Sequence, residues 1–143
     1  MVLTPELLVD ASALARWHEP LARERLEALL LGGRLAICAI TMLECGFAVR
    51  NGASHALVVG ELRAAYHQVP VGEAAFQRAL WVQGALAREG RHRAVRLPRL
   101  LVAATAELAG LAVLHADADF DRVAEVTGQP CRWVLCARDE PAA

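Results

Sequence analysis

Residues 100–129 read LLVAATAELAGLAVLHADADFDRVAEVTGQ, and this stretch decides the fold. Its first part lies between Pro98 and Gly110, the usual order of a proline that opens a helix and a glycine that ends it. The apolar run at 111–115 predicts a buried strand, and the pattern at 120–126 predicts a short second helix. Acidic residues fill the turn between these two elements. The stretch therefore predicts a helix, a strand and a helix, with carboxylates where the strand ends.

The rest of the chain alternates in the same way between short apolar runs and segments with helical spacing. Strands are expected at 7–9, 35–39 and 132–135, and a strand or an extended loop at 66–71. Helices are expected at about 12–17, 20–31, 42–50, 55–65 and 73–88. Ser12 and Ser54 are the expected N-caps of two of them. Nearly continuous apolar strands between helices predict an α/β/α sandwich around a parallel sheet.

The chain has the length of one domain, at 143 residues. We expect that domain at 1–136, followed by a short polar tail at 137–143. Although 56% of the residues are hydrophobic, no apolar run approaches the ~18 residues that span a bilayer, so no membrane association is expected. The N-terminus lacks the basic start and long apolar stretch of a secretion signal, which makes the cytoplasm the expected location.

Charge and cysteine content narrow the possible functions. The net charge is −1, so a nucleic-acid partner needs a local basic patch. All fifteen basic residues are arginine. The absence of lysine argues against receiver domains and haloacid-dehalogenase-like phosphatases, which place an Asp after the first strand but rely on a Lys near the phosphate. The cysteines form no CxxC pair and are expected to be buried thiols: Cys38, Cys45, Cys131 and Cys136.

Acidic side chains follow the predicted strands. Asp10 closes the first strand, Asp117 follows the strand at 111–115, and Glu44 lies one turn into the helix after the second strand. Because ligand sites in open parallel sheets lie beyond the carboxyl ends of the strands, we expect these three carboxylates to converge. Carboxylates held together need a cation, and a set of oxygen ligands favours Mg²⁺ or Mn²⁺. The spacing predicts a hydrolase that uses a hard metal ion.

Each of these residues also has a local explanation. Asp10 is placed to cap the next helix, and residues 41–44, TMLE, read as a capping box in which the Glu turns back to the backbone. The acids within 117–121 surround a helix start, where the helix dipole favours anions. Ser12 is as suitable for an N-cap as for support of a metal ligand. Spacing alone leaves these alternatives open.

Three blocks of sequence together resemble one family. They are LLVDASAL at 7–14, TMLECGF at 41–47, and the stretch at 100–129 with its AATA and DADF elements. In this order they are similar to the PIN-domain ribonuclease toxins of the VapC type, over nearly the whole chain. The resemblance implies a parallel sheet between helices and Mg²⁺- or Mn²⁺-dependent cleavage of RNA, commonly transfer or ribosomal RNA. It also implies a type II toxin–antitoxin system, a VapB-type antitoxin and a homodimer.

The resemblance assigns roles to particular side chains at the strand ends. It implies metal ligation by Asp10, Glu44 and Asp117, and support in catalysis by Asp119 and Ser12. Metal-bound water would then attack the phosphodiester, and no covalent nucleophile would be needed. His115 is a further candidate near this site, although we expect it to pack at the end of its strand.

One position departs from the family pattern. The acid that normally follows the proline, as in PDLLIAATA, is replaced here by Arg99. The start of a helix favours anions, so helix stability does not explain this arginine. Its guanidinium can take the place of a cation between Asp10 and Asp117. An inactivating change, a natural loss of activity and a rotated helix each remain open. We expect weak metal binding and slow or absent cleavage; the alternative is a non-enzymatic module that binds RNA or an antitoxin.

A basic stretch precedes the helix that carries Arg99. It contains Arg91, His92, Arg93 and Arg96, and the three arginines are expected to contact RNA phosphates beside the acidic cleft. A merely solvated loop is the alternative. The stretch holds no Phe, Tyr or Trp, which argues against base stacking by this loop.

Apolar side chains near the carboxylates are candidate anchors for an antitoxin helix. They are Leu14, Trp17 and Phe47. For Phe47 we favour a place in the core.

Overall fold

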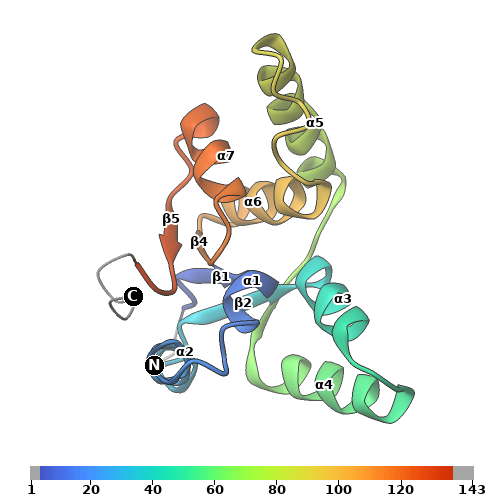
Figure 1. The fold of residues 1–143 in the computed structure, drawn as a ribbon, viewed down its shortest axis with the longest axis vertical. Coiled ribbons are helices and arrows are strands. Elements are labelled where there is room, and N and C mark those ends of the chain that lie inside the picture. The colour runs from blue at the N-terminus through green and yellow to red at the C-terminus, as the bar shows by residue number, and fades with distance from the viewer. Residues whose placement is uncertain (1–3, 137–143) are drawn as a thin grey trace.

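The computed structural model describes residues 4–136, and a five-stranded parallel sheet lies at its centre (Figure 1). The strands are short: β1 Leu7–Val9, β2 Leu35–Cys38, β3 His67–Val69, β4 Ala112–His115 and β5 Cys131–Trp133. Their order across the sheet is β3-β2-β1-β4-β5, and every neighbouring pair is parallel. The chain winds outward in one direction from β1 to β3 and in the other from β4 to β5. The place where the direction reverses, at the carboxyl ends of β1 and β4, is where open parallel sheets bind their ligands.

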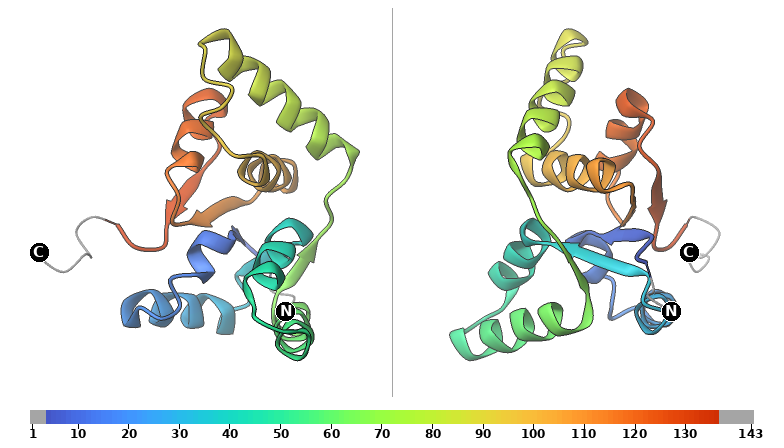
Figure 2. Two further views of the ribbon diagram at one scale, coloured as in Figure 1. Left: turned by 45° about the vertical axis from the view of Figure 1, so that its right-hand side comes forward. Right: turned by 180° about the vertical axis from the view of Figure 1, so that it is seen from behind.

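Helices cover both faces of the sheet. They are α1 Ala11–Leu14, α2 Pro20–Leu31, α3 Ala39–Ala48, α4 Gly52–Ala65, α5 Glu73–Arg88, α6 Leu97–Ala109 and α7 Asp119–Thr127. Figures 1 and 2 show α5, α6 and α7 on one side of the sheet and α1 to α4 on the other. The predicted α/β/α sandwich is confirmed.

Two hydrophobic cores hold these layers together. Within the strands, neighbouring side chains point to opposite faces: Leu8 and Val113 pack with α5, α6 and α7, whereas Leu7 and Leu114 pack with the helices of the other layer. The three inner strands are therefore almost completely buried. Continuous burial explains why they read as unbroken apolar runs in the sequence.

Most predicted elements are present, with some corrected ends. The predicted helices at 20–31 and 73–88 match α2 and α5, and the uncertain segment at 66–71 contains the strand β3. The cap prediction for α4 is wrong, because this helix begins at Gly52 and the side chain of Asn51 accepts the Ser54 N–H. The predicted tail at 137–143 lies outside the described residues.

The capping box considered as an alternative role for residues 41–44 is not formed. The helix begins at Ala39, so Thr41 lies inside its first turn. The Thr41 hydroxyl donates to the Val9 carbonyl at 3.2 Å and thereby ties α3 to β1. Glu44, which would have turned back to the backbone, is free to face the carboxyl end of the sheet.

The four cysteines are free thiols that differ in burial. Cys38 is buried as predicted, whereas Cys45, Cys131 and Cys136 are only half-buried, and no disulfide joins these four residues. Burial raises the pKa of the Cys45 and Cys131 thiols to about 11. Among residues 4–136, no helix combines the length and the apolar character that a membrane span needs.

Candidate active site

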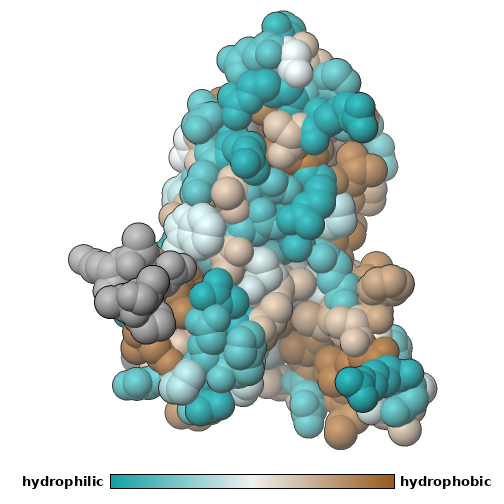
Figure 3. Space-filling model, viewed as in Figure 1, coloured by the Kyte–Doolittle hydropathy of each residue, from teal (hydrophilic) through white to brown (hydrophobic). Residues whose placement is uncertain are grey.

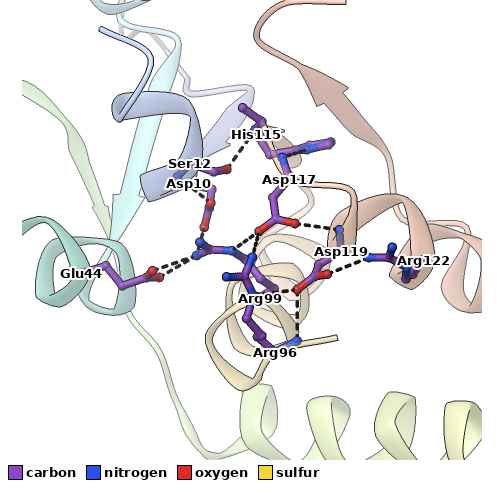
Figure 4. A network of polar contacts seen from close by, with 10 residues as sticks. Asp10, Ser12, Glu44, Arg96, Arg99, His115, Asp117, Asp119 and Arg122 are labelled. Atoms are coloured by element: carbon purple, nitrogen blue, oxygen red, sulfur yellow. Dashed lines mark hydrogen bonds and ion pairs between the residues drawn. The ribbon is translucent and has the colours of Figure 1, made fainter. Parts of the chain in front are cut away.

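Three carboxylates from separate parts of the chain meet at the carboxyl end of the sheet (Figure 4). Asp10 directly follows β1, Asp117 lies two residues beyond β4, and Glu44 projects from α3. Asp10 is fully buried, Asp117 nearly so, and Glu44 is half-buried. The parallel pairing of β1 with β2 and β4 places the ends of these strands side by side. The fold thus brings together the three acids that follow its inner strands.

The side chain of Arg99 lies at the point where these carboxylates meet. Arg99 Nη1 donates to Asp10 Oδ1 at 3.1 Å and to the two Glu44 oxygens at 2.7 and 3.0 Å. Arg99 Nε donates to Asp117 Oδ2 at 3.0 Å. The residue lies in the first turn of α6 and is only 8% exposed. The guanidinium group therefore binds all three acids at once, from inside the site.

Electrostatic interactions favour the charged forms of Arg99 and Asp117. Burial alone would lower the pKa of Arg99, but the charges of Asp10, Asp117 and Glu44 outweigh it and raise that pKa above the usual arginine value. Burial likewise would raise the pKa of Asp117, but the Asp119 N–H and the Arg99 guanidinium outweigh it and lower that pKa. Each partner stabilises the charged form of the other.

Asp10 has a structural task besides its contact with Arg99. Its Oδ2 accepts the Ser12 N–H at 2.8 Å and caps α1. The prediction that Ser12 is the cap of this helix is therefore wrong. The Ser12 hydroxyl instead accepts the Ala116 N–H at 2.9 Å, which joins α1 to the turn after β4. One carboxylate thus serves both the helix start and the site.

Asp119 lies beside the three acids and is held by other arginines. It accepts hydrogen bonds from the Arg96 N–H at 3.1 Å, from Arg96 Nε at 3.2 Å and from Arg122 Nη1 at 2.8 Å. Its own N–H donates to Asp117 Oδ1 at 2.9 Å. Arg96, 68% exposed, also bonds Asp117 through Nη2. Asp119 therefore positions Asp117 and does not contact the Arg99 guanidinium.

His115 is fully buried under the turn that carries Asp117. Its Nδ1 accepts the Asp117 N–H at 3.2 Å, which leaves the ring proton on Nε2. Nε2 has no hydrogen-bond partner among the described residues. The ring packs against Phe120 and Trp133, with centroids 4.9 Å away in both cases. Burial lowers the pKa of His115, so it is neutral and packs as expected.

The types of side chain at this site suit a metal ion, but their arrangement does not. Three carboxylates from β1, α3 and the turn after β4 are the ligands that Mg²⁺ and Mn²⁺ prefer. Their common point, however, is where the Arg99 guanidinium lies, and arginine cannot lose its charge to make room. Within residues 4–136, no group of three or more His, Cys, Asp and Glu side chains is arranged to hold a metal ion. The site as built does not fit a divalent cation.

An apolar groove runs from this site between α1, α3 and α4. Its volume is about 750 Å³, and Glu44 and Arg99 lie in its wall. Leu14 and Trp17 line it, together with residues of α4 that carried no signal in the sequence. Hydrophobic surface gathers over α3 and α4 at the lower right of Figure 3.

The core position expected for Phe47 is wrong, because its side chain is 92% exposed. The buried positions of α3 are Thr41, Met42 and Gly46, and Phe47 follows one residue later on the outer face.

The basic stretch lies in the loop between α5 and α6. Arg91 pairs with Glu89 at 3.4 Å and with Glu125 of α7 at 3.3 Å, whereas Arg93 is exposed. Arg96 reaches the acidic cluster itself. The involvement of Arg96 and Arg122 in that cluster was not expected, because nothing in their spacing marks it.

Comparisons with known proteins agree with this geometry. A family model for the PIN domain matches residues 7–126. Ribonuclease VapC21 of Mycobacterium tuberculosis is 41% identical over 133 residues, covering 93% of this chain and 96% of that protein. Ribonuclease VapC51 of the same organism is 39% identical over 130 residues, covering 91% and 93%.

Solved structures show the same fold. DNA-bound VapBC from Salmonella typhimurium has a TM-score of 0.74 at 18% identity, covering 92% of this chain and 100% of that one. VapBC2 from Rickettsia felis, bound to a promoter DNA fragment, has a TM-score of 0.73 at 12% identity, covering 89% and 97%. By sequence and by fold, this chain belongs to the PIN-domain family and is a homologue of the VapC ribonucleases.

Proposed function

We propose that this protein is a toxin homologue of a type II toxin–antitoxin system that binds RNA but cleaves it slowly or not at all. One observation carries the proposal: the Arg99 guanidinium bonds Asp10, Glu44 and Asp117 together. The relatives are named ribonucleases, and their metal chemistry needs free carboxylates. In this chain a built-in cation already occupies the point where they meet.

Coulomb's law indicates how much Arg99 should weaken the binding of a divalent metal ion. At about 5 Å and an effective dielectric near 20, one pair of unit charges is worth roughly 3 kcal/mol. Replacing a carboxylate with Arg99 removes one attractive contact for a divalent ion and adds one repulsive contact. Since the guanidinium is almost completely buried, solvent screens these interactions only weakly. We therefore expect that Mg²⁺ and Mn²⁺ bind this chain far more weakly than they bind the Arg99→Asp variant.

Restoring the carboxylate tests the proposal. We expect the Arg99→Asp variant to bind Mn²⁺ in calorimetry and to cleave transfer or ribosomal RNA when Mg²⁺ or Mn²⁺ is added. The unchanged chain should do neither to a comparable extent. Aspartate suits the first turn of α6 better than arginine does, and the added metal ion would replace the lost guanidinium between the carboxylates, so the variant should fold when Mg²⁺ or Mn²⁺ is present.

The matched control is the double variant Arg99→Asp/Asp10→Asn. It should lose the cleavage that the single variant gains, which would exclude a contaminating nuclease. Equal metal-dependent cleavage by the unchanged chain and the Arg99→Asp variant would overturn the proposal.

RNA contact is the second part of the proposal. The exposed Arg93 and the partly exposed Arg91 lie in the loop that leads to α6, and Arg96 connects this loop to the acidic cluster. They would bind phosphates and hold the strand over the cleft. A module that binds RNA or an antitoxin without any cleavage is the limiting case of this proposal, and the position of Arg99 favours it.

An antitoxin of the VapB type is the proposed protein partner. The neighbours in the structural comparison include VapBC complexes, and the groove beside the cleft is apolar and open. We propose that an amphipathic helix of the antitoxin docks there on Leu14 and Trp17. Trp17→Ala should reduce retention of a co-expressed antitoxin, whereas Trp81→Ala on α5 should leave it unchanged.

A homodimer in the cytoplasm completes the proposal. Large apolar side chains remain exposed on α5, namely Phe76, Leu80 and Trp81. A surface of this kind is more often covered in an assembly than left in water. Light scattering after gel filtration should give a molar mass twice that of one chain. The Leu80→Glu variant should have the molar mass of a single chain.

A further inference from the structure

Trp133 lies beside the acidic cluster at the same end of the sheet. It is the last residue of the edge strand β5 and pairs in register with His115 of β4. Asp117 follows His115 by two residues, so Trp133 lies one strand away from the turn that carries this acid. The sheet therefore places an aromatic ring next to the proposed RNA site.

Two contacts fix the ring while part of it stays exposed. Its Nε1 donates to the Asp121 oxygens at 3.1 and 3.3 Å. The ring also packs at a tilt of 55° on His115, which is itself completely buried. Trp133 nevertheless remains 37% exposed. A ring already held in place loses little conformational freedom when a ligand packs on it.

The first turn of α7 connects this ring to the acidic cluster. Asp121 contacts Trp133, and the next residue, Arg122, binds Asp119. Asp119 in turn donates its N–H to Asp117. This turn therefore holds both a partly exposed guanidinium and an exposed aromatic ring near the cleft. An RNA strand needs these two groups in alternation, the cation for its phosphate and the ring for its base.

We propose that Trp133 is a stacking platform for one unpaired base of the RNA strand that crosses the cleft. The inference rests on the proposed RNA function and adds a preference for single-stranded RNA. The only donor of the indole is already bound to Asp121, so the exposed ring offers a π-face and no hydrogen bond to a base edge. Binding should therefore depend on the presence of a base and only slightly on which base it is.

Binding can be measured without cleavage in the presence of EDTA. The probe is a short, unstructured, fluorescently labelled single-stranded RNA, compared with the same sequence in a duplex. Trp133→Ala should weaken binding of the single strand roughly tenfold and leave the weaker binding of the duplex unchanged. Leu31→Ala is the control, because Leu31 is also an exposed apolar side chain but lies at the end of α2, just before β2 and thus at the amino end of the sheet.

A second measurement does not depend on removing the ring. The chain has three tryptophans, so Trp17→Phe/Trp81→Phe leaves Trp133 as the only one. Single-stranded RNA should quench its emission, and an abasic site at one position of the RNA should abolish the quenching.

The outcomes separate the two proposals. Unchanged emission of Trp133 while RNA binds, or equal affinity of Trp133→Ala and the unchanged chain, would overturn the stacking role and leave RNA binding intact. If the unchanged chain binds no RNA, both proposals fail. Quenching of Trp133 by a protein partner and not by RNA would assign the ring to a protein interface and overturn the inference.

Discussion

At the scale of single residues, Arg99 determines what the site can do. A family site that gathers carboxylates normally leaves their repulsion to be neutralised by a bound cation. Here the cation is covalently part of α6 and bonds to each of the three acids. Its charge is permanent, because arginine does not lose its proton in proteins. All three acids are thus engaged by Arg99, which is the reason for our proposal that they bind a metal ion only weakly.

Removing this guanidinium should destabilise the fold strongly. Arg99→Met leaves buried carboxylates without a partner, and breaking such a buried cluster typically costs about 3–5 kcal/mol. Urea unfolding should detect this loss, and added Mg²⁺ should recover part of it in the variant only. Arg78→Met is the control, since the Arg78–Glu107 pair is more exposed and should contribute at most about 1 kcal/mol. Equal losses in both variants would contradict the counter-ion role of Arg99.

Buried titratable groups should also make the protein sensitive to acid. Burial lowers the pKa of His115 in the folded chain below 6.5. As the pH falls, the imidazole is therefore protonated in the unfolded chain before it is protonated in the folded chain. The contribution of His115 to the free energy of unfolding is therefore complete above pH 6.5 and decreases progressively below it. The depressed pKa of Asp117 acts in the same direction below pH 3.8.

The unfolding free energy, followed from neutral to acidic pH, should therefore fall less steeply in His115→Asn than in the unchanged chain. Asparagine can still accept the Asp117 N–H but does not titrate. The exposed His18 supplies the control variant His18→Asn, which should follow the unchanged chain. Parallel curves for all three proteins would contradict the prediction.

Residue identities in the site were predictable only where spacing determines them. Asp10, Glu44 and Asp117 follow strands, and parallel strands must end at one edge, so their meeting could be expected. The caps could not be predicted in the same way. Asp10 and Ser12 both suit a helix start, and only the packing of α1 against the turn after β4 decides that Ser12 bonds Ala116.

At the scale of elements, α6 illustrates how far local sequence determines structure. Pro98 lies in its first turn, and Gly110 ends it with φ at +71°. Both ends were predictable, because only proline and glycine suit these backbone positions so well. The edge strands β3 and β5 were harder to place. They are half-exposed and three residues long, so they show neither an unbroken apolar run nor a clear alternation.

Replacing two helix glycines with alanine should change the free energy of unfolding in opposite directions. At Gly110 the positive φ opposes any Cβ, so Gly110→Ala should lower the unfolding free energy by about 1–2 kcal/mol. Gly84 lies inside α5, and a Cβ there meets no atom within 4 Å. Gly84→Ala should therefore raise the unfolding free energy by about 0.5–1 kcal/mol. Thermal melting tests both, and shifts of the same sign would contradict the role of backbone conformation.

At the scale of the whole molecule, the net charge is small and the charged side chains form local clusters. The net charge of −1 gives no overall attraction for RNA. In the cluster at the strand ends, carboxylates and guanidinium groups largely neutralise one another. The loop between α5 and α6 adds exposed arginines outside this cluster. The proposed RNA binding would depend on a few phosphate contacts, which makes its salt dependence informative.

The salt dependence of RNA binding should therefore become weaker in Arg91→Gln/Arg93→Gln. Each phosphate contact to single-stranded RNA contributes about 0.7 to the slope of log affinity against log salt, so losing two contacts should reduce the slope by about 1–1.5. Arg91 is partly neutralised by Glu89 and Glu125, so Arg93 should account for the larger share. Arg63→Gln, on α4 at the opposite end of the molecule in Figure 1, should leave the slope unchanged. A similar change in both variants would mean that RNA responds to the charge of the whole chain and not to this loop.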